Sequence, residues 1–197
     1  MKQKISIIYI FFFLCASETL ANDLNHFINT KWKLSQTQLK YLMEGKVLTT
    51  SSVQSQNNKQ SFDLKALAYH TVKCSKALRK LSLLENYKDY ISFIQSSTYH
   101  NKLFTLKADH TLLPHPMIIH IIVDRPTKAG KYPFTFPTGI FKGLKGQFEI
   151  KEFQNRCLLY AESHYNGVAS RFPDLVIEIF SETLSKLGGE LLMRKSK

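Results

Sequence analysis

Hydrophobic and polar positions repeat with two different periods along this chain. From residue 46 to residue 165 there are several short runs rich in β-branched and aromatic residues, some of them alternating with a period of two, as in half-buried strands. Two stretches, Cys74–Phe93 and Pro173–Arg194, instead repeat their apolar residues at helical spacing. The strand-like runs are 46–53, 62–72, 97–99, 103–108, 117–123, 146–153 and 157–165. This order predicts a curved antiparallel sheet that grips one long helix, with space for a ligand between them.

The last helix is expected to begin at Pro173-Asp174, since proline suits a first turn and aspartate suits the positive end of the helix dipole. The pair Gly188-Gly189 interrupts its apolar pattern, at a cost of about 1 kcal/mol per glycine relative to alanine. Two interpretations stay open. The glycines mark a frayed or broken helix end, or they mark a hinge or a thin place where a ligand approaches the backbone.

The segment 127–143 is predicted to be a connection, because prolines punctuate this part of the chain and restrict strands to the gaps between them. It is unusually aromatic for a loop. Loops of this kind often cover a site or touch a membrane. The alternative is that these rings pack in the core of a long hairpin. Under the first interpretation the gate residues are Tyr132, Phe134 and Phe141.

The N-terminus is typical of a secretory signal peptide. Lys2 and Lys4 precede an apolar run at 5–16, and small residues follow up to a predicted cleavage after Ala21. This run is shorter than the roughly 20 apolar residues of a membrane span. We therefore expect a signal peptide at 1–21, a helical extension at 22–45, capped at Ser35, and an exported protein in the periplasm or outside the cell.

The chain is basic, with 27 Lys and Arg against 15 Asp and Glu and a formal net charge of +12. Such a charge permits transient contact with an anionic membrane surface, or it simply keeps the protein soluble. Because an exported protein does not meet the genome, no nucleic-acid partner is expected.

Three passages resemble the START-like helix-grip superfamily, also called SRPBCC, which includes polyketide cyclase/dehydrase and lipid-transport proteins. They are Leu84–Tyr90 continuing to Ser97, Gly143–Ile150, and Arg171–Val176. The resemblance covers roughly 46–194 and implies an α+β domain at 46–197. In that fold two short helices follow an early strand, and a curved antiparallel sheet grips the C-terminal helix. It also implies an apolar ligand such as a sterol, phospholipid, quinone or polyketide.

Two cysteines follow the predicted cleavage site, Cys74 and Cys157. In an oxidising compartment an even pair is a disulfide candidate, whereas two separate buried thiols are the alternative. The resemblance adds a geometric expectation. If the strand ending near Lys73 lies beside the strand starting at Arg156, both cysteines sit at the same end of the sheet.

Few residues suggest chemistry. His110, His115 and His120 are five apart, which puts successive side chains on opposite faces of a strand and disfavours a metal site. His120, between Ile118 and Ile122, is either a core histidine or a polar handle in the cavity. Arg125 either pairs with its neighbour Asp124 or meets a ligand's acidic head group. The predicted ligand-binding residues are His120, Tyr160, Glu162 and Phe180, together with the three gate residues.

No nucleophile elbow and no phosphate-binding loop occurs in the sequence. We therefore expect a protein that binds or transfers a lipid or hydrophobic small molecule, without a cofactor, and an enzyme is the less favoured interpretation. The main alternative is a cyclase or hydrolase that uses His120 or Glu162 in the same cavity. A protein-interaction module with a filled core is the other alternative.

Overall fold

The computed structural model describes residues 26–109, 111, 116–139, 141–170 and 172–197. The predicted signal peptide lies outside the described residues, as do His110, His115 and Arg171. The chain forms two compact units, divided after Lys40.

The first unit contains a helix at 26–31, and α2 (Gln36–Met43) begins at its end. Ser35 Oγ accepts a hydrogen bond from the Gln38 backbone N–H at 3.2 Å, and the Ser35 N–H donates to Gln38 Oε1 at 2.9 Å. This reciprocal pair is a capping box, so Ser35 caps the helix as predicted.

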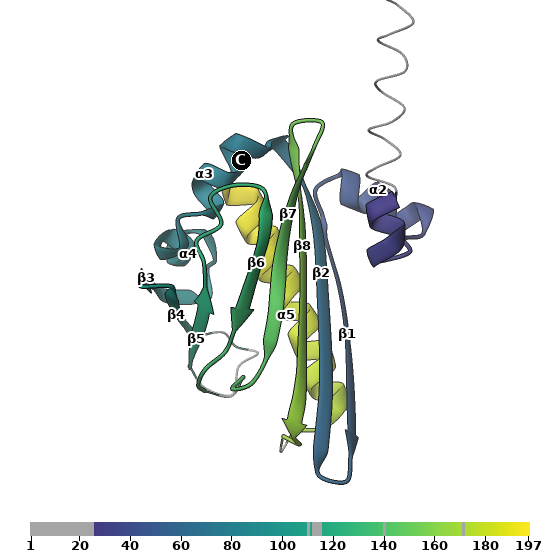
Figure 1. The fold of residues 1–197 in the computed structure, drawn as a ribbon, viewed down its shortest axis with the longest axis vertical. Coiled ribbons are helices and arrows are strands. Elements are labelled where there is room, and N and C mark those ends of the chain that lie inside the picture. The colour runs from purple at the N-terminus through teal and green to yellow at the C-terminus, as the bar shows by residue number, and fades with distance from the viewer. Residues whose placement is uncertain (1–25, 110, 112–115, 140, 171) are drawn as a thin grey trace, which may run out of the picture. The chain divides into compact units, whose positions relative to one another are not determined.

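The second unit contains an eight-stranded antiparallel sheet with the spatial order β1-β2-β8-β7-β6-β5-β4-β3 (Figure 1). The strands are β1 Val47–Gln56, β2 Lys59–Lys73, β3 Ile94–His100, β4 Leu103–Ala108, β5 Met117–Val123, β6 Gly130–Thr135, β7 Lys145–Phe153 and β8 Arg156–Val168. Strands β2 and β8 pair from Lys59↔Val168 to Lys73↔Arg156. The strand ending at Lys73 therefore does lie beside the strand starting at Arg156.

Strand β6 lies inside the segment that the sequence predicted to be a loop. It contains Pro133, which has no N–H to give to a ladder. The proline is tolerated because β6 pairs along its length with β7 but meets β5 only at Ile122↔Thr135 and Val123↔Phe134. The rule that prolines exclude strands was therefore wrong here, and the hairpin alternative for this segment is correct.

The helices are α3 (Cys74–Leu81), the short η1 (Leu84–Asn86), α4 (Tyr87–Tyr90) and α5 (Asp174–Lys195). In Figure 1, α5 runs behind the sheet from the lower ends of β1 and β2 to the end that carries α3. Helix α5 is continuous through its two glycines. A Cβ on Gly188 would lie 3.2 Å from the Phe93 ring, and one on Gly189 would lie 3.2 Å from Val47. The glycines therefore allow close packing of an unbroken helix and mark no break in it.

We call the side of the sheet that faces α5 the inner face, and the opposite side the outer face. Val47, Thr49 and Ser51 of β1 identify the inner face, because Val47 packs on Met193 of α5 and the two hydroxyls reach carbonyls of α5. Side chains alternate along a strand, and partners across an antiparallel pair share a face. The register therefore assigns every paired residue to one face.

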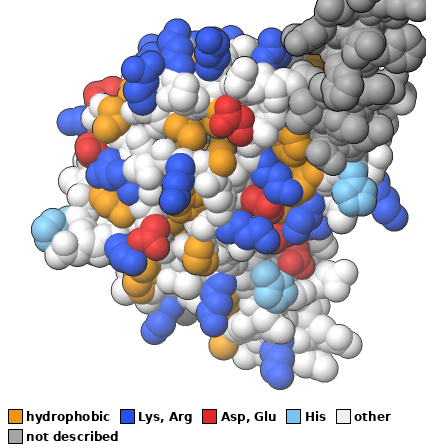
Figure 2. Space-filling view, turned by 45° about the horizontal axis from the view of Figure 1, so that its top comes forward, with side chains coloured by type: hydrophobic (Ala, Val, Ile, Leu, Met, Phe, Trp, Pro, Cys, Tyr) orange, Lys and Arg blue, Asp and Glu red, His pale blue; other side chains and the backbone are white. Residues whose placement is uncertain are grey.

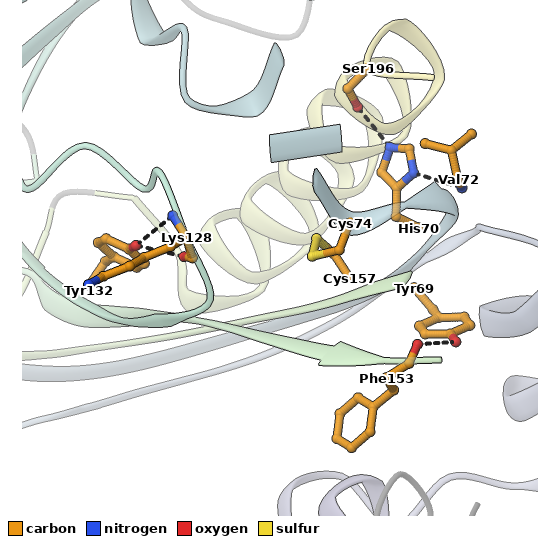
Figure 3. Close-up of a disulfide and its surroundings, with 9 residues drawn as sticks. All are labelled: Tyr69, His70, Val72, Cys74, Lys128, Tyr132, Phe153, Cys157 and Ser196. Atoms are coloured by element: carbon orange, nitrogen blue, oxygen red, sulfur yellow. Dashed lines mark hydrogen bonds between the residues drawn. A yellow bond between two sulfur atoms is a disulfide. The ribbon is translucent and has the colours of Figure 1, made fainter. Parts of the chain in front are cut away.

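Cys74 and Cys157 form a disulfide with a Cα–Cα distance of 4.6 Å, which ties the start of α3 to β8 (Figure 3). Both residues are fully buried in the main core cluster. The Cys74 N–H donates to the Asn155 carbonyl beside the bond. Helix α3 is thereby fixed at the end of the sheet.

His70 and Ser196 anchor the C-terminal end of α5 next to this disulfide, and both residues are fully buried (Figure 3). The Val72 N–H donates to His70 Nδ1 at 3.2 Å, so Nε2 carries the ring proton and donates to Ser196 Oγ at 3.0 Å. Ser196 in turn donates to the Leu192 carbonyl at 2.6 Å. Burial, and secondarily the charge of Lys197, lowers the pKa of His70 from 6.5 to about 4.

We predict that the double variant Cys74→Ser/Cys157→Ser unfolds more easily. The bridged residues are separated by 83 positions, so loss of the cross-link should remove about 4 kcal/mol from the free energy of unfolding in the chain-entropy model. Denaturant unfolding with and without reductant measures this. Reductant should shift the parent to the midpoint of the variant and leave the variant unchanged. A parent whose purified, non-reduced mass shows two free thiols would contradict the prediction.

We predict that His70 makes the fold sensitive to acid. The His70 ring binds a proton more tightly in the unfolded state than in the folded state. The free energy of unfolding should therefore be at its full value above pH 6.5 and should fall as the pH drops toward about 4. The loss should approach about 3 kcal/mol. Urea unfolding across this range should show a shallower pH dependence in His70→Leu than in the parent. His100→Leu, at the exposed end of β3, should keep the parental slope. Equal slopes in His70→Leu and the parent would refute this role.

Candidate functional site

The inner face of β7 and β8 is apolar, and α5 presents apolar side chains to the same space. On the sheet the register places Phe148 opposite Ala161, with Leu159 two residues further along β8. Helix α5 contributes Phe180, Leu184 and Leu187, which pack on the core cluster of β3 to β5. We call these six residues the inner apolar surface.

This surface is not closed. Phe148 is 38% exposed although it lies on the inner face, and the other five members are only partly buried. Core residues of this size are usually more than nine-tenths buried, as Phe104 and Phe134 are in this protein. Apolar side chains that stay accessible in this way can bind an apolar molecule, since covering them removes hydrocarbon from water.

Aromatic rings line one side of this surface. The Phe148 ring lies 4.7 Å from the Phe134 ring, which contacts Phe136 at 5.9 Å. Phe136 continues the series to Phe141 at 5.7 Å. Tilted and edge-on pairs at these distances are favourable and fix the rings in place. The series joins the buried core to the exposed Phe148.

The predicted gate residues lie on this side, but two of them are fixed. Tyr132 and Phe134 belong to β6 and are buried in the main core cluster. The Tyr132 hydroxyl donates to the Lys128 carbonyl at 2.7 Å and also accepts from its N–H (Figure 3). Their place in a strand corrects the expectation of a loop. Phe141 is partly buried and contacts two apolar clusters, one containing Phe93 and one containing Leu144.

His120 is on the outer face, so the structure contradicts its predicted place in the cavity. It pairs with Thr105, whose Oγ1 lies 3.1 Å from His120 Nδ1. Its neighbours on that face, Ile118 and Ile122, are 58% and 44% exposed. The inner face of β5 carries Ile119 and Ile121 instead, which pack on the core clusters. Because β5 is apolar on both faces, its sequence does not indicate whether the odd-numbered or the even-numbered residues point inward.

Tyr160 and Glu162 are also on the outer face, which is a second correction. Both lie on the same face of the sheet as Lys65 and Gln147, whereas Ala161 lies on the opposite face. The Tyr160 hydroxyl donates to Glu162 Oε2 at 2.7 Å. Burial and this carboxylate together raise the pKa of Tyr160. Of the predicted ligand residues, Tyr132 and Phe134 lie on the inner face, Phe180 lies on α5 and Phe141 lies between β6 and β7. His120, Tyr160 and Glu162 lie on the outer face.

A shallow pocket of about 250 Å³ does occur on the outer face. Its lining includes Asp63, Lys65, Lys145, Glu162 and His164. His164 Nδ1 lies 2.8 Å from Asp63 Oδ1, and both side chains are more than half exposed. Exposed pairs of this kind contribute little energy. The lining is charged and solvated, so this pocket does not suit an apolar ligand.

Arg125 and Asp124 do not pair with each other. Asp124 binds Lys102 at 2.8 Å. Arg125 donates to the Ser82 carbonyl at 2.6 Å and to Glu85 at 2.8 Å. Its guanidinium also lies 4.5 Å from the centre of the Tyr99 ring. Arg125 therefore holds the α3–η1 connection against the sheet and is not available to an acidic head group.

The described part of the chain contains no group of three His, Cys, Asp or Glu side chains placed to hold a metal ion. Within the same residues, no helix combines the length and apolarity needed to cross a membrane.

Sequence reasoning missed Phe148 and Ala161, although a signal was present. In β7 the residues Lys145, Gln147, Glu149 and Lys151 alternate with Gly146, Phe148 and Ile150, which marks the second set as inward. The β7–β8 register then carries that assignment to Leu159 and Ala161.

In sequence, the chain matches no family model and no curated protein. Its fold is found in solved structures. A START superfamily protein from Mycobacterium smegmatis is 15% identical, with a TM-score of 0.52 over 67% of this chain and 95% of that one. The Zhui aromatase/cyclase from Streptomyces sp. R1128 is 10% identical, with a TM-score of 0.50 over 69% and 93%.

The di-domain aromatase/cyclase StfQ of the steffimycin biosynthetic pathway gives a TM-score of 0.55 at 8% identity, over 70% of this chain and 49% of that one. Identities this low speak for the fold alone. The curved antiparallel sheet, the short helices after β2 and the long last helix agree with these structures, and the chain shares their helix-grip fold.

Proposed function

We propose that this protein binds a lipid or another hydrophobic small molecule between the inner face of its sheet and α5. The observation that carries the proposal is the inner apolar surface, above all the 38% exposure of Phe148 on the side that α5 covers. A ligand that covers such a surface removes hydrocarbon from water, which favours the complex.

The expected driving force is apolar burial. Each ~100 Å² of hydrocarbon removed from water stabilises the complex by about 2.5 kcal/mol before the entropic cost of association. Among inner-face residues of β8, Ser163 supplies a buried hydroxyl that can orient a ligand with a polar group. The six residues of the inner apolar surface include no titratable side chain, and this favours binding over a reaction.

The similar structures support a ligand-binding role without naming the ligand. They include a START superfamily protein and two aromatase/cyclases. A cyclase would need an acid or base beside its substrate, and the two residues that the sequence suggested for that role, His120 and Glu162, are on the outer face. The carrier proposal is therefore the simpler one.

We further propose that the chain is exported, with cleavage after Ala21, and that it exchanges its ligand by transient contact with an anionic membrane surface. The apolar run at 5–16 and the net charge of +12 support these two points. No nucleic-acid partner and no cofactor is part of this proposal.

Filling the inner apolar surface should remove binding. Ala161→Phe places a ring beside Phe148, and we expect at least a tenfold loss of affinity for anilinonaphthalene sulfonate and for a fluorescent fatty acid. Fluorescence titration measures this, and native mass spectrometry after purification from membrane-containing cells should show bound lipid in the parent only.

Lys107→Phe is the matched control, since it adds the same ring to the outer face at an exposed site. If Ala161→Phe does not fold, as judged by thermal unfolding, Leu184→Phe tests the same space from α5. Parental affinity in a folded Ala161→Phe variant would overturn the proposed site.

The export proposal predicts a mature protein that begins at Asn22. Expression of the whole chain in a bacterium with a periplasm, followed by fractionation and N-terminal sequencing, measures this. Ala21→Arg should block processing, because the cleavage site needs a small residue. Full-length parent protein in the cytosolic fraction would count against export.

A further inference from the structure

One end of the sheet-and-helix unit carries a dense group of positive charges. It is formed by the exposed side of α3 and by the last turn of α5 with the residues after it. The segments 73–84 and 191–197 contain no Asp or Glu. We call this group the basic end; it comprises Lys73, Lys76, Arg79, Lys80, Arg194, Lys195 and Lys197. Figure 2, whose view brings the top of Figure 1 forward, shows Lys and Arg side chains gathered along its upper rim.

The cations are held on a rigid frame. Helix α3 buries Cys74, Ala77, Leu78 and Leu81, so its alternate face presents Lys76 and Arg79 to solvent. Lys80 Nζ donates to the carbonyls of Lys195 and Lys197 at 3.2 and 2.7 Å, which joins α3 to the end of α5. The disulfide ties α3 to β8, and the His70–Ser196 hydrogen bond ties the C-terminal end of α5 to β2.

Positive side chains outnumber the neighbouring acidic ones at this end. Glu85, which follows α3, is paired with Arg125 at 2.8 Å. The other neighbouring carboxylates are Glu152 of β7 and Glu190 of α5. Arg156 of β8 adds a further cation, since it pairs with Lys73 on the adjacent strand. Like charges on a rigid frame repel one another and reduce stability. A bound polyanion would offset this repulsion.

We propose that the basic end is the surface through which this protein docks on anionic lipid headgroups. The choice of a membrane as the partner rests on the proposed function, because an apolar ligand resides in bilayers. Each Lys or Arg near such a surface contributes about a fivefold gain in partitioning. Several of them acting together give reversible binding without insertion of an apolar segment.

The basic end is less suited to nucleic acid. The exposed face of α3 carries Ser75, Lys76 and Arg79 and no aromatic side chain for stacking on bases. This helix has only eight residues, and its apolar face is committed to the core. Leu83, which is 37% exposed just after α3, adds an apolar group that suits a headgroup layer.

The test is binding to vesicles of phosphatidylcholine with and without one-third phosphatidylglycerol, measured by co-sedimentation. The triple variant Lys76→Gln/Arg79→Gln/Arg194→Gln removes three cations and spares Lys80, which has a structural contact. We expect about a hundredfold loss of partitioning on the anionic vesicles. Binding of the parent should be absent on pure phosphatidylcholine and should fall steeply between about 0.05 and about 0.2 M salt.

The matched control is Lys59→Gln/Lys107→Gln/Lys131→Gln, which removes the same charge from exposed positions elsewhere. It should bind within about threefold of the parent. Equal losses in both triple variants would mean that only net charge matters and would overturn the proposal. So would tighter binding of the parent to a labelled oligonucleotide than to anionic vesicles, or competition by inorganic phosphate alone.

A second readout separates docking from a structural role. Neutralising the basic end should leave thermal stability unchanged or higher, because repulsion is relieved.

The exposed apolar residues Val176 and Ile179 at the opposite end of α5 provide the other check. If Ile179→Asn abolishes vesicle binding and the basic-end variant does not, the proposal is wrong. Ligand uptake in solution, tested through Ala161→Phe, stays independent of either result.

Discussion

The long antiparallel pairing of β2 with β8 is the constraint on which the rest of this structure depends. It runs from Lys59↔Val168 to Lys73↔Arg156, and it brings Cys74 and Cys157 to the same end. Once these strands are in register, the disulfide fixes α3 and the hairpin from β8 to β7 determines which side chains point toward α5. A slip of one residue would exchange the two faces and place charged residues under the helix.

Both polar contacts to β1 and β2 and apolar packing hold helix α5 on the sheet. Asp174 accepts hydrogen bonds from Ser55 at 2.6 Å and Gln60 at 2.9 Å, and Glu182 accepts from the Ser51 N–H. At the other end the His70–Ser196 bond and Lys80 hold the last turn. Between these contacts Phe180, Leu184 and Leu187 pack on a core cluster and stay only partly buried. Apolar area left exposed in this way costs stability and is available to a ligand.

The two proposals divide the unit into places with different physical properties. The inner apolar surface would act through burial and would be little affected by salt, whereas the basic end would act through charge and would be weakened by salt. Locking the basic end to the core through the disulfide keeps its charges away from the ligand space.

Much of the fold could be predicted from the order of elements. Alternation marked β2, helical spacing marked α3 and α5, and Ser35 marked the start of α2. These signals are local, because each depends on residues within one or two turns or on one face of one strand. Strand β6 was missed because Pro133 is compatible with a strand only where the neighbouring ladder is open, and that depends on how β5 diverges from it.

The ligand residues could be predicted only in part, for a reason that is also physical. The sequence correctly grouped His120 with Ile118 and Ile122, and Tyr160 with Glu162, since a period of two fixes which residues share a face. It does not fix which of the two faces is covered by α5. That choice is made by pairing between strands far apart in the chain and by Cys157, whose bond to α3 commits Leu159 and Ala161 to the inner face. The sequence alone thus determined the elements and their alternation, and only the tertiary structure decided which side of the sheet faces the helix.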